Sequence, residues 1–596
     1  MKVTAIWFGA TIGDTNDIST QRGGSLAMLL APNRLLQHLQ NEFAGKATFD
    51  PIISGASTIT IDCTPVPGSD SEPDLDLSAL VASVRAFLSK RQALLDEGDH
   101  KSIDLNTVRF AVAAVPKDIQ GLFVGDGFQQ SGEVNALALL DAQIAMDQYR
   151  QASFHTFTPL AEGKKPTKSI VCQLDGKSPA VETDRTTPVG SAVLARRTFG
   201  RERKSDFFKH ILDDATDPRR VAVLKRLETL PFSQSLQDLS VLPPDPEQEF
   251  QGDSAALQNL PGAISNKIAV LYLDGNSFGK NLARNSIDER RAFSQQVRTH
   301  QANMLVHLLN WAAPADALDA ASNDLIAPKT PDVTSKDAAR WPERLRLEIL
   351  LWGGDEVAIA MPAWRAFETV AVIEQALCKF RIDWPDGKSE TLTHSVGLAF
   401  ANVKTPIRSL KAMAENLADD AKSLSKTENV FSIGIAEAVD VPGDDITGLR
   451  ARGFKAGDGQ SLAFDPSSLG QEGTFADVWN GLRALDTDLP ASQGNTLLRG
   501  LRKQAATAEP DASSNAGKLS ERDYIANELR RLAGATDEQV EETLALLSQP
   551  FFATDRLDIG LSWRSYLNGF VCPFKPRFVE DASDGGSDSF KQATAA

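Results

Sequence analysis

The sequence predicts an α/β fold built from two ferredoxin-like domains of βαββαβ order, with a helical C-terminal domain after them. Three observations predict it. Residues 265–440 alternate apolar runs of strand length with helical patterns of period 3.6, in the order βαββαβ. Residues 1–160 show approximately the same order, and the clearest patterns after 441 are helical, at Tyr524–Leu532 and Asp537–Leu547. Two copies of one topology suggest an internal duplication.

The length of 596 residues leads us to expect several domains. The expected segments are a first ferredoxin-like domain at 1–160, an irregular region with a degenerate metal knuckle and a linker at 161–264, a second ferredoxin-like domain at 265–440, a mixed and then helical domain at 441–579, and a disordered tail at 580–596. The tail is assigned from its Ser, Asp and Gly content.

Composition excludes several classes of protein. With 42% hydrophobic and 24% charged residues, most of the chain should fold as a globular protein. The net charge of −17 excludes a protein that coats nucleic acid through bulk positive charge. Since no apolar run approaches ~18 residues and no secretory signal pattern is present, we expect no membrane segment. Four widely separated cysteines suit a reducing compartment, so we expect a cytoplasmic protein.

In the first domain we expect strands at Val3–Phe8, Ala56–Ile61 and Val108–Val115, and helices at Gly24–Leu39, Leu77–Leu95 and Glu133–Tyr149. Its hairpin position, around Ser54 and Gly55, carries no pair of carboxylates. The loop at 9–24 contains Asp14, Asp17 and Arg22, and its composition favours a solvated loop.

Residues 161–264 contain two features that could indicate binding. Cys172 begins a stretch with the outline of a metal knuckle but without partner cysteines, so we expect no metal there. A dense basic cluster follows, formed by Arg196, Arg197, Arg201, Arg203 and Lys204. Such a run favours a solvated face, with contact to nucleic acid or another subunit as the alternative.

The second domain should contain strands at 268–273, 345–351, 356–360, 392–401 and 430–435, with helices after the first, third and fourth. Pro406 suits the first turn of the last helix. The polar, proline-containing stretch Ala313–Ala339 is expected to be a surface insertion. His394 lies mid-strand and is expected to be structural.

Carboxylates follow two of these strands. Asp274 ends the strand at 268–273, and Asp355 and Glu356 follow a Gly353-Gly354 turn, where glycine supplies a positive φ without strain. If the two strands are neighbours, the three acids converge and repel one another unless a cation lies between them. Mg²⁺ or Mn²⁺ suits such oxygen ligands, and two such ions can stabilise phosphoryl transfer.

Small residues after Asp274 would let backbone N–H groups approach a phosphate chain at a helix N-terminus. The candidate nucleotide-binding residues are Gly275, Asn276, Ser277, Phe278, Lys280, Gly353, Gly354 and Lys422, with Arg284 as a further cation. Each motif alone is more often an ordinary turn. Their occurrence together, after apolar strands in one βαββαβ frame, favours catalysis.

At these residues the sequence resembles the palm domain shared by GGDEF diguanylate cyclases, class III nucleotidyl cyclases and the large subunit of type III CRISPR effector complexes. Trp352-Gly-Gly-Asp-Glu-Val resembles the first of these. The segment from His394 to Ile407, with Ala414-Glu415 and Ala421-Lys422, resembles the last, as does the arrangement of two palms separated by a knuckle region. Arg22-Gly-Gly-Ser-Leu is similar to the loop that leads into the first helix of that subunit.

The resemblance implies an RNA-activated enzyme that joins ATP into 3′–5′ linked cyclic oligoadenylates. It implies as partners the other subunits of a type III CRISPR complex, a guide RNA and a target RNA. Asp274, Asp355 and Glu356 would hold the metals, Gly275–Phe278 would cradle phosphate and ribose, and Lys422 would hold the triphosphate.

The chain departs from this family at three points. Glu356 replaces an aspartate, which lengthens the side chain by a methylene. The N-terminal HD nuclease domain is expected to be missing, so no cleavage of single-stranded DNA is expected. The knuckle cysteines are mostly missing, which leaves a CRISPR-independent relative open. Two other functions also remain open: a non-catalytic scaffold subunit, and a stand-alone cyclase that makes a cyclic dinucleotide as a homodimer.

Overall fold

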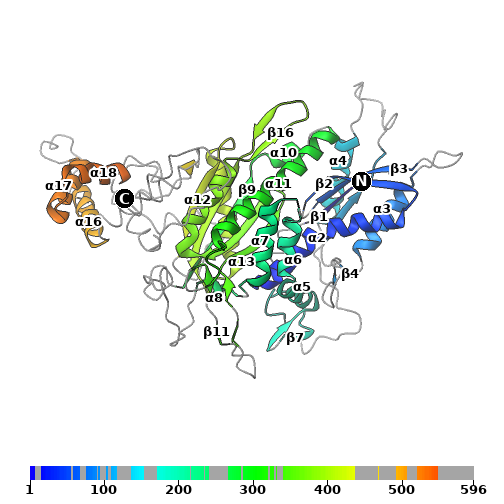
Figure 1. The fold of residues 1–596 in the computed structure, drawn as a ribbon, viewed down its shortest axis with the longest axis horizontal. Helices are drawn as coiled ribbons and strands as arrows, with labels where there is room; N and C mark the ends of the chain where they lie inside the picture. The colour runs from blue at the N-terminus through cyan, green and yellow to red at the C-terminus, as the bar shows by residue number, and fades with distance from the viewer. Residues whose placement is uncertain are drawn as a thin grey trace.

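The computed structural model describes residues 1–6, 15–55, 58–66, 75–89, 91–93, 102–104, 109–116, 136–152, 171–184, 186–214, 216–233, 235–240, 266–282, 286–319, 323–327, 330–331, 340–341, 343–436, 467–468, 491–506 and 520–547. Two larger sheets form the body of this part of the chain, and the helix α11 (Ile287–Ala312) runs between them (Figure 1). The expected mixed α/β class is confirmed. No helix within these ranges combines the length and apolar character needed to span a membrane.

The first sheet has the strand order β2-β3-β1-β6, and every neighbouring pair is antiparallel. Its strands are β1 (Lys2–Ile6), β2 (Ala47–Ser54), β3 (Thr58–Pro65) and β6 (Arg109–Ala113). The helices α2 (Ile18–Glu42) and α3 (Leu77–Leu88) connect them, and α4 (Ala136–Ala152) packs on β1 and β6. This order and these connections are those of the predicted ferredoxin-like unit.

Helix α2 begins at Ile18, six residues before the expected start at Gly24, because Asp17 caps it. The Asp17 side chain accepts a hydrogen bond from the Thr20 amide at 2.8 Å. Glycine is a poor helix former, which is why Gly23 and Gly24 suggested a loop. The helix needs Gly23, since a Cβ there would lie 1.8 Å from the Arg196 carbonyl oxygen of a crossing helix.

The expectation of an irregular region at 161–264 was wrong for residues 182–240. These residues form the hairpin β7 (Glu182–Asp184) and β8 (Thr187–Val189), and the helices α5 (Ser191–Glu202), α6 (Lys204–Ile211), α7 (Pro218–Thr229) and α8 (Leu236–Ser240). Helix α5 crosses α2 at Gly23 and Gly200, where each glycine removes a Cβ that would clash with the other backbone.

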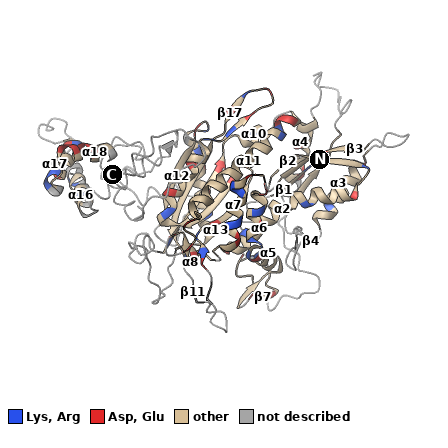
Figure 2. Ribbon diagram, in the orientation of Figure 1, with Lys and Arg blue, Asp and Glu red and all other residues tan. Residues whose placement is uncertain are grey.

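The basic cluster at 196–204 is not a solvated face, which corrects that expectation. Arg196 and Lys204 are buried. Arg197 forms ion pairs with Asp17 and Asp184, and Arg201 joins Asp184 at 3.2 Å. Figure 2 shows basic and acidic segments intermixed around α5 and α6. The partners of this run lie elsewhere in the chain, so local sequence could not reveal that it is paired.

The second sheet has the order β14-β15-β9-β18-β19-β20. Its strands are β9 (Lys267–Gly275), β14 (Glu348–Gly353), β15 (Glu356–Pro362), β18 (His394–Asn402), β19 (Val430–Ile435) and β20 (Ser467–Ser468). The first four form the predicted ferredoxin-like unit, and β19 adds to β18 in parallel. The helix α13 (Ile407–Leu424) covers one face, while α11 and α12 (Ala366–Leu377) pack toward the other.

The stretch Ala313–Ala339 was expected on the surface, which is wrong for residues 323–327. Leu325 and Ile326 are buried, and Asp324 is fully buried. The Asp324 carboxylate accepts hydrogen bonds from Arg365 at 2.8 and 2.9 Å and from the Trp364 indole at 2.8 Å. The polar composition of this stretch therefore did not indicate the buried ion pair between Asp324 and Arg365.

The remaining described elements are short or lie near the C-terminus. They are β4 (Arg91–Ala93), β5 (Ser102–Asp104), α10 (Phe278–Leu282), β10 (Ile326–Ala327), β11 (Thr330–Pro331), β12 (Arg340–Trp341), β13 (Arg344–Leu345), the 3₁₀ helix η3 (Ala363–Arg365), β16 (Arg381–Asp383), β17 (Ser389–Thr391), α16 (Ala491–Ala506), α17 (Glu521–Ala533) and α18 (Asp537–Leu547). The last three share a small apolar core, which confirms the two helices expected after residue 520. The expected tail at 580–596 lies outside the described residues.

Candidate active site

The strand register brings the predicted acids to one end of the second sheet. Glu356 pairs directly with Asp274 across β15 and β9, and the turn at Gly354, with a φ of 59°, joins β14 to β15. The Gly275 amide donates a hydrogen bond to the Asp355 carbonyl oxygen at 3.0 Å. The loop after β9 and the Gly-Gly-Asp-Glu turn are therefore tied together. The hypothesis that strand 268–273 lies beside strand 345–351 was wrong, because β15 lies between β9 and β14.

Asp274 and Glu356 lie on the sheet face that α13 covers. Cross-strand partners share a face, and so do residues two apart on one strand, which places Tyr272 with them. The Lys422 Nζ atom of α13 lies 2.5 Å from Asp274 Oδ2. The Tyr272 hydroxyl group lies close enough to Glu356 to lower the pKa of that carboxyl group. Lys411 Nζ lies 5.6 Å from the centre of the Tyr272 ring.

Burial and mutual repulsion raise the pKa values of Asp355 and Glu356. Burial raises the pKa of Asp355, the negative charge of Asp274 raises that pKa further, and the Lys422 ammonium group opposes the rise. Burial also raises the pKa of Glu356, with Asp355 adding to the rise and the Tyr272 hydroxyl group opposing it. Such a cluster is stabilised by any cation that approaches it.

The residues fit a hard divalent cation by their chemistry. Among the described residues, no group of three or more His, Cys, Asp or Glu side chains is gathered around one point, so the acids do not form a finished metal cage. Three carboxylates that share a strand edge are nevertheless the oxygen donors that Mg²⁺ and Mn²⁺ prefer. Asp274 would have to exchange its Lys422 partner for the metal ion.

The loop after Asp274 presents its backbone rather than its amide side chain. Asn276 is 2% exposed, and its side chain donates to Thr393 Oγ1 at 3.1 Å and accepts from the Ser395 hydroxyl at 2.9 Å. Ser277 is exposed and has a φ of 63°, in the left-handed region. Gly279 and Lys280 are exposed beside it. Arg284 lies outside the described residues.

His394 is structural, as expected. The side chain is buried, and its ring packs edge-on against Phe278 and Phe380, with centroids 5.4 and 4.9 Å away. Burial lowers the pKa of His394 to about 3, so the ring is neutral at ordinary pH. His394 therefore packs against Phe278 and adds no positive charge to the site.

A cavity of about 1190 Å³ lies between the two ferredoxin-like domains. The second domain lines it with Gly353–Glu356, Phe278 and Gly279, Tyr272, Lys411 and Glu415. The first domain lines it with Lys2 and Thr4 of β1, the turn at 53–55, and Asp141 and Ile144 of α4. The volume exceeds that of typical ligand pockets, so a nucleotide fits. Asp274 and Lys422, which are both described, are not among the lining residues.

Residues 267–431 match the protein family described as Cas10/Cmr2, second palm domain. This part of the chain is therefore similar to the second palm domain of Cas10/Cmr2. The match covers β9 to the beginning of β19, and so includes the turn at 353–356 and Lys422. No curated protein matches the chain.

Several solved structures resemble the chain at low sequence identity. Csm1 of T. onnurineus is 12% identical over 95% of this chain and 68% of that one, with a TM-score of 0.44. A Csm1–Csm4 cassette in complex with cA4 is 12% identical over 95% of this chain and 69% of that chain, with a TM-score of 0.43. The GGDEF domain of TpbB (YfiN) from Pseudomonas aeruginosa is 17% identical over 29% of this chain and 78% of that chain, with a TM-score of 0.18.

Sequence reasoning missed three residues of the second domain that border the acids: Tyr272, Lys411 and Glu415. A signal for two of them was present. Lys411, Glu415 and Lys422 have helical spacing and form a polar stripe on α13, beside the apolar stripe that was recognised. Tyr272 was read only as part of an apolar strand. The contribution of the first domain depends on tertiary packing and leaves no local signal.

Replacing Asp355 by asparagine should raise the free energy of unfolding at pH 8. The raised pKa of Asp355 means that keeping this carboxylate charged in the folded palm costs free energy. That cost is full above the folded pKa and disappears as the pH falls below the unfolded value of about 3.9. The gain from Asp355→Asn should therefore shrink toward zero near pH 4, as measured by urea unfolding across this pH range. A loss of stability at pH 8 would contradict the raised pKa.

Proposed function

We propose that this protein is a Mg²⁺-dependent nucleotidyltransferase that makes cyclic oligoadenylates from ATP, as a subunit of an RNA-guided type III CRISPR complex that target RNA activates. One observation carries the proposal. The pair Asp274 and Glu356, with Asp355 beside them, lies next to a nucleotide-sized cavity inside a Cas10/Cmr2-type palm.

The residues can be given separate tasks. Ser277 and Gly279 are exposed at the start of α10, where N–H groups are suited to hold phosphate oxygens. Asn276 fixes that loop through Thr393 and Ser395. Lys422 neutralises Asp274 in the absence of a metal and is free to hold a triphosphate once the metal replaces it.

Asp274, Asp355 and Glu356 would hold the metal ions, which supply charge stabilisation to the attacking and leaving oxygens. The buried neighbours of the acids keep the site's electrostatic interactions strong, because they exclude water. Glutamate keeps a carboxylate at this position, and the Tyr272 hydroxyl group lowers the pKa of that carboxyl group. The departure from aspartate is therefore compatible with catalysis.

The RNAs and partner subunits are expected because residues 267–431 are similar to the second palm domain of Cas10/Cmr2. The net charge of −17 favours RNA contacts made through other subunits over contacts made by bulk charge. The basic run at 196–204 does not provide an RNA surface, because its cations are buried or paired within the chain.

A product assay tests the proposal. The purified chain is given Mg²⁺ and each nucleoside triphosphate, first alone and then in its native complex with target RNA, and mass spectrometry identifies the products. Cyclic oligoadenylate that forms only with target RNA is the expected result. A cyclic dinucleotide made by the chain alone, as a homodimer, would replace the proposal with a stand-alone cyclase. A folded complex that makes no product would replace it with a scaffold.

A further inference from the structure

Helix α11 contacts the hairpins of both domains with one face. Ser294 Oγ accepts a hydrogen bond from the Ser54 amide at 3.4 Å, at the turn between β2 and β3. Gln301 Nε2 donates to the Gly354 carbonyl oxygen at 2.5 Å, in the Gly-Gly-Asp-Glu turn. The two residues are seven apart, which is about two helical turns, and both line the cavity.

The helix that carries Gln301 is firmly placed. On and beside the face that carries Gln301, the helix is packed into the core through Phe293, Val297, Leu305 and Leu308, which are at most 5% exposed. Near its first turn, the Arg290 guanidinium group is 1% exposed and donates to Asp141 of α4 at 2.9 Å. Asp141 also binds Lys2 of β1 at 2.8 Å. Helix α11 is therefore fixed to the first domain at one end and reaches the catalytic turn from there.

The hydrogen bond from Gln301 is made to the carbonyl oxygen that directly precedes Asp355 in the chain. The Gly354 carbonyl group belongs to the peptide unit that joins Gly354 to Asp355, and this unit is planar. A hydrogen bond to this carbonyl oxygen therefore fixes the orientation of the peptide plane that precedes the Asp355 Cα atom. The next carbonyl oxygen, that of Asp355, accepts from the Gly275 amide at 3.0 Å. The Asp355 backbone is thus held from both sides, by α11 and by the loop after β9.

We propose that Gln301 is a positioning residue for the catalytic turn, a role that rests on the proposed function of Asp355. Glutamine suits the task because it combines length with a neutral donor. A glutamate would place a fourth carboxylate beside the three acids, and a lysine would form ion pairs with them. Gln301 is 8% exposed, so little water competes for the Gly354 oxygen.

The test replaces Gln301 by methionine, which keeps the length of the side chain and removes the donor. The matched control is Gln296→Met on the same helix, because Gln296 also bonds to backbone, donating to the Asp383 carbonyl at 2.8 Å and accepting from the Asp383 amide at 2.9 Å. In the complete complex with target RNA, Gln301→Met should lower kcat about tenfold or more, with KM for ATP changed less than about twofold. The control should match the unmodified protein.

Two further measurements need no turnover. Mn²⁺ binding to the complex, followed by electron paramagnetic resonance, should weaken severalfold in Gln301→Met. Hydrogen exchange of a peptide that covers Trp352–Val357 should become faster in this variant and remain unchanged in Gln296→Met. If the exchange and Mn²⁺ affinity of Gln301→Met equal those of the unmodified protein, Gln301 has no positioning role. If the unmodified complex makes no product, the proposed function fails instead, while the exchange measurement still decides whether Gln301 holds the turn.

Discussion

Replacing Asp355 by alanine should lower product formation by a factor on the order of 10³ or more and leave the protein folded. The side chain belongs to a cluster in which Asp274 and Asp355 raise the pKa of their neighbours through repulsion. Removing it takes away a metal-binding oxygen pair but also relieves that repulsion. Activity and stability should therefore change in opposite directions, which is typical of a functional residue rather than a structural one.

The measurement is the cyclic oligoadenylate yield per complex at saturating ATP, together with the melting temperature. Asp419→Ala is the matched control, because Asp419 is an exposed acid on α13 of the same palm. It should change neither quantity. Full activity in Asp355→Ala would remove Asp355 from the mechanism. Loss of soluble folded protein in that variant would show that the acid has a structural task.

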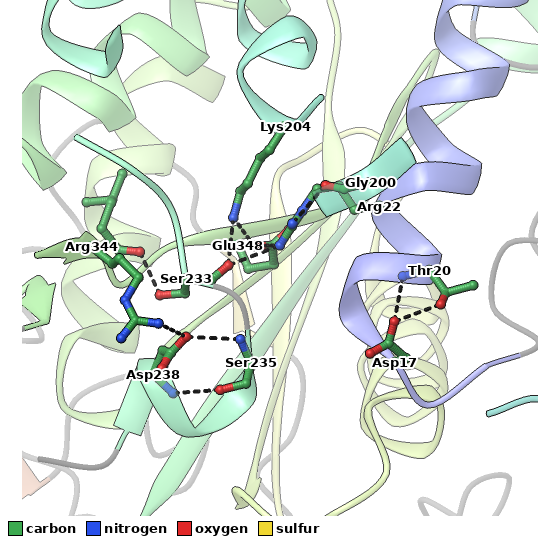
Figure 3. Close-up of polar contacts among 11 residues, drawn as sticks. Asp17, Thr20, Arg22, Gly200, Lys204, Ser233, Ser235, Asp238, Arg344 and Glu348 are labelled. Carbon is green, nitrogen blue, oxygen red and sulfur yellow. Dashed lines mark hydrogen bonds and ion pairs between the residues drawn. The ribbon is translucent and has the colours of Figure 1, made fainter. Parts of the chain in front are cut away.

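Replacing Glu348 by glutamine should lower the free energy of unfolding by about 3–5 kcal/mol. Glu348 is fully buried on β14 and accepts two hydrogen bonds from the Arg22 guanidinium group, at 2.7 and 2.6 Å. Lys204 contacts the same carboxylate and also donates to the Ser233 carbonyl at 3.2 Å (Figure 3). Glutamine keeps the shape of the side chain but leaves the buried Arg22 guanidinium group without a counter-charge.

Urea unfolding at pH 7 measures this loss, and Lys204→Met is the comparison variant. Burial and the charge of Arg22 lower the pKa of Lys204 to about 7, so keeping this ammonium group charged in the folded protein costs free energy at pH 7. Arg22 can pair with Glu348 alone in that variant, and the free energy of unfolding should not fall by more than about 1 kcal/mol. A loss below about 1 kcal/mol in Glu348→Gln would show that water reaches the carboxylate.

The strands around the site could be predicted because each is a plain apolar run, but the neighbour of β9 could not: β15 lies beside it and not β14. The pairing of Asp274 with Glu356 follows from that observed order. Tyr272 could not be assigned a role, because its hydroxyl group acts across the sheet on a residue 84 positions away. Gln301 looked like any polar residue on a partly exposed helix.

The charged residues of the first 240 positions were the least predictable from sequence. Arg22 and Lys204 lie in stretches whose composition indicates solvent, yet their common partner is 326 and 144 residues away. The available signal was Glu348 itself, a carboxylate at the head of a strongly apolar strand. A charge in such a position requires a buried partner, although sequence alone does not say which residue supplies it.

The contact of Glu348 with Arg22 and Lys204 also limits how the protein can be divided or recombined. A fragment with only residues 266–436 would keep the catalytic strands but would carry Glu348 without either cation, five residues before Gly353. A first half taken from a relative would serve only if it brought an arginine and a lysine to the same place. The segments 1–240 and 266–436 should therefore be expressed as one unit.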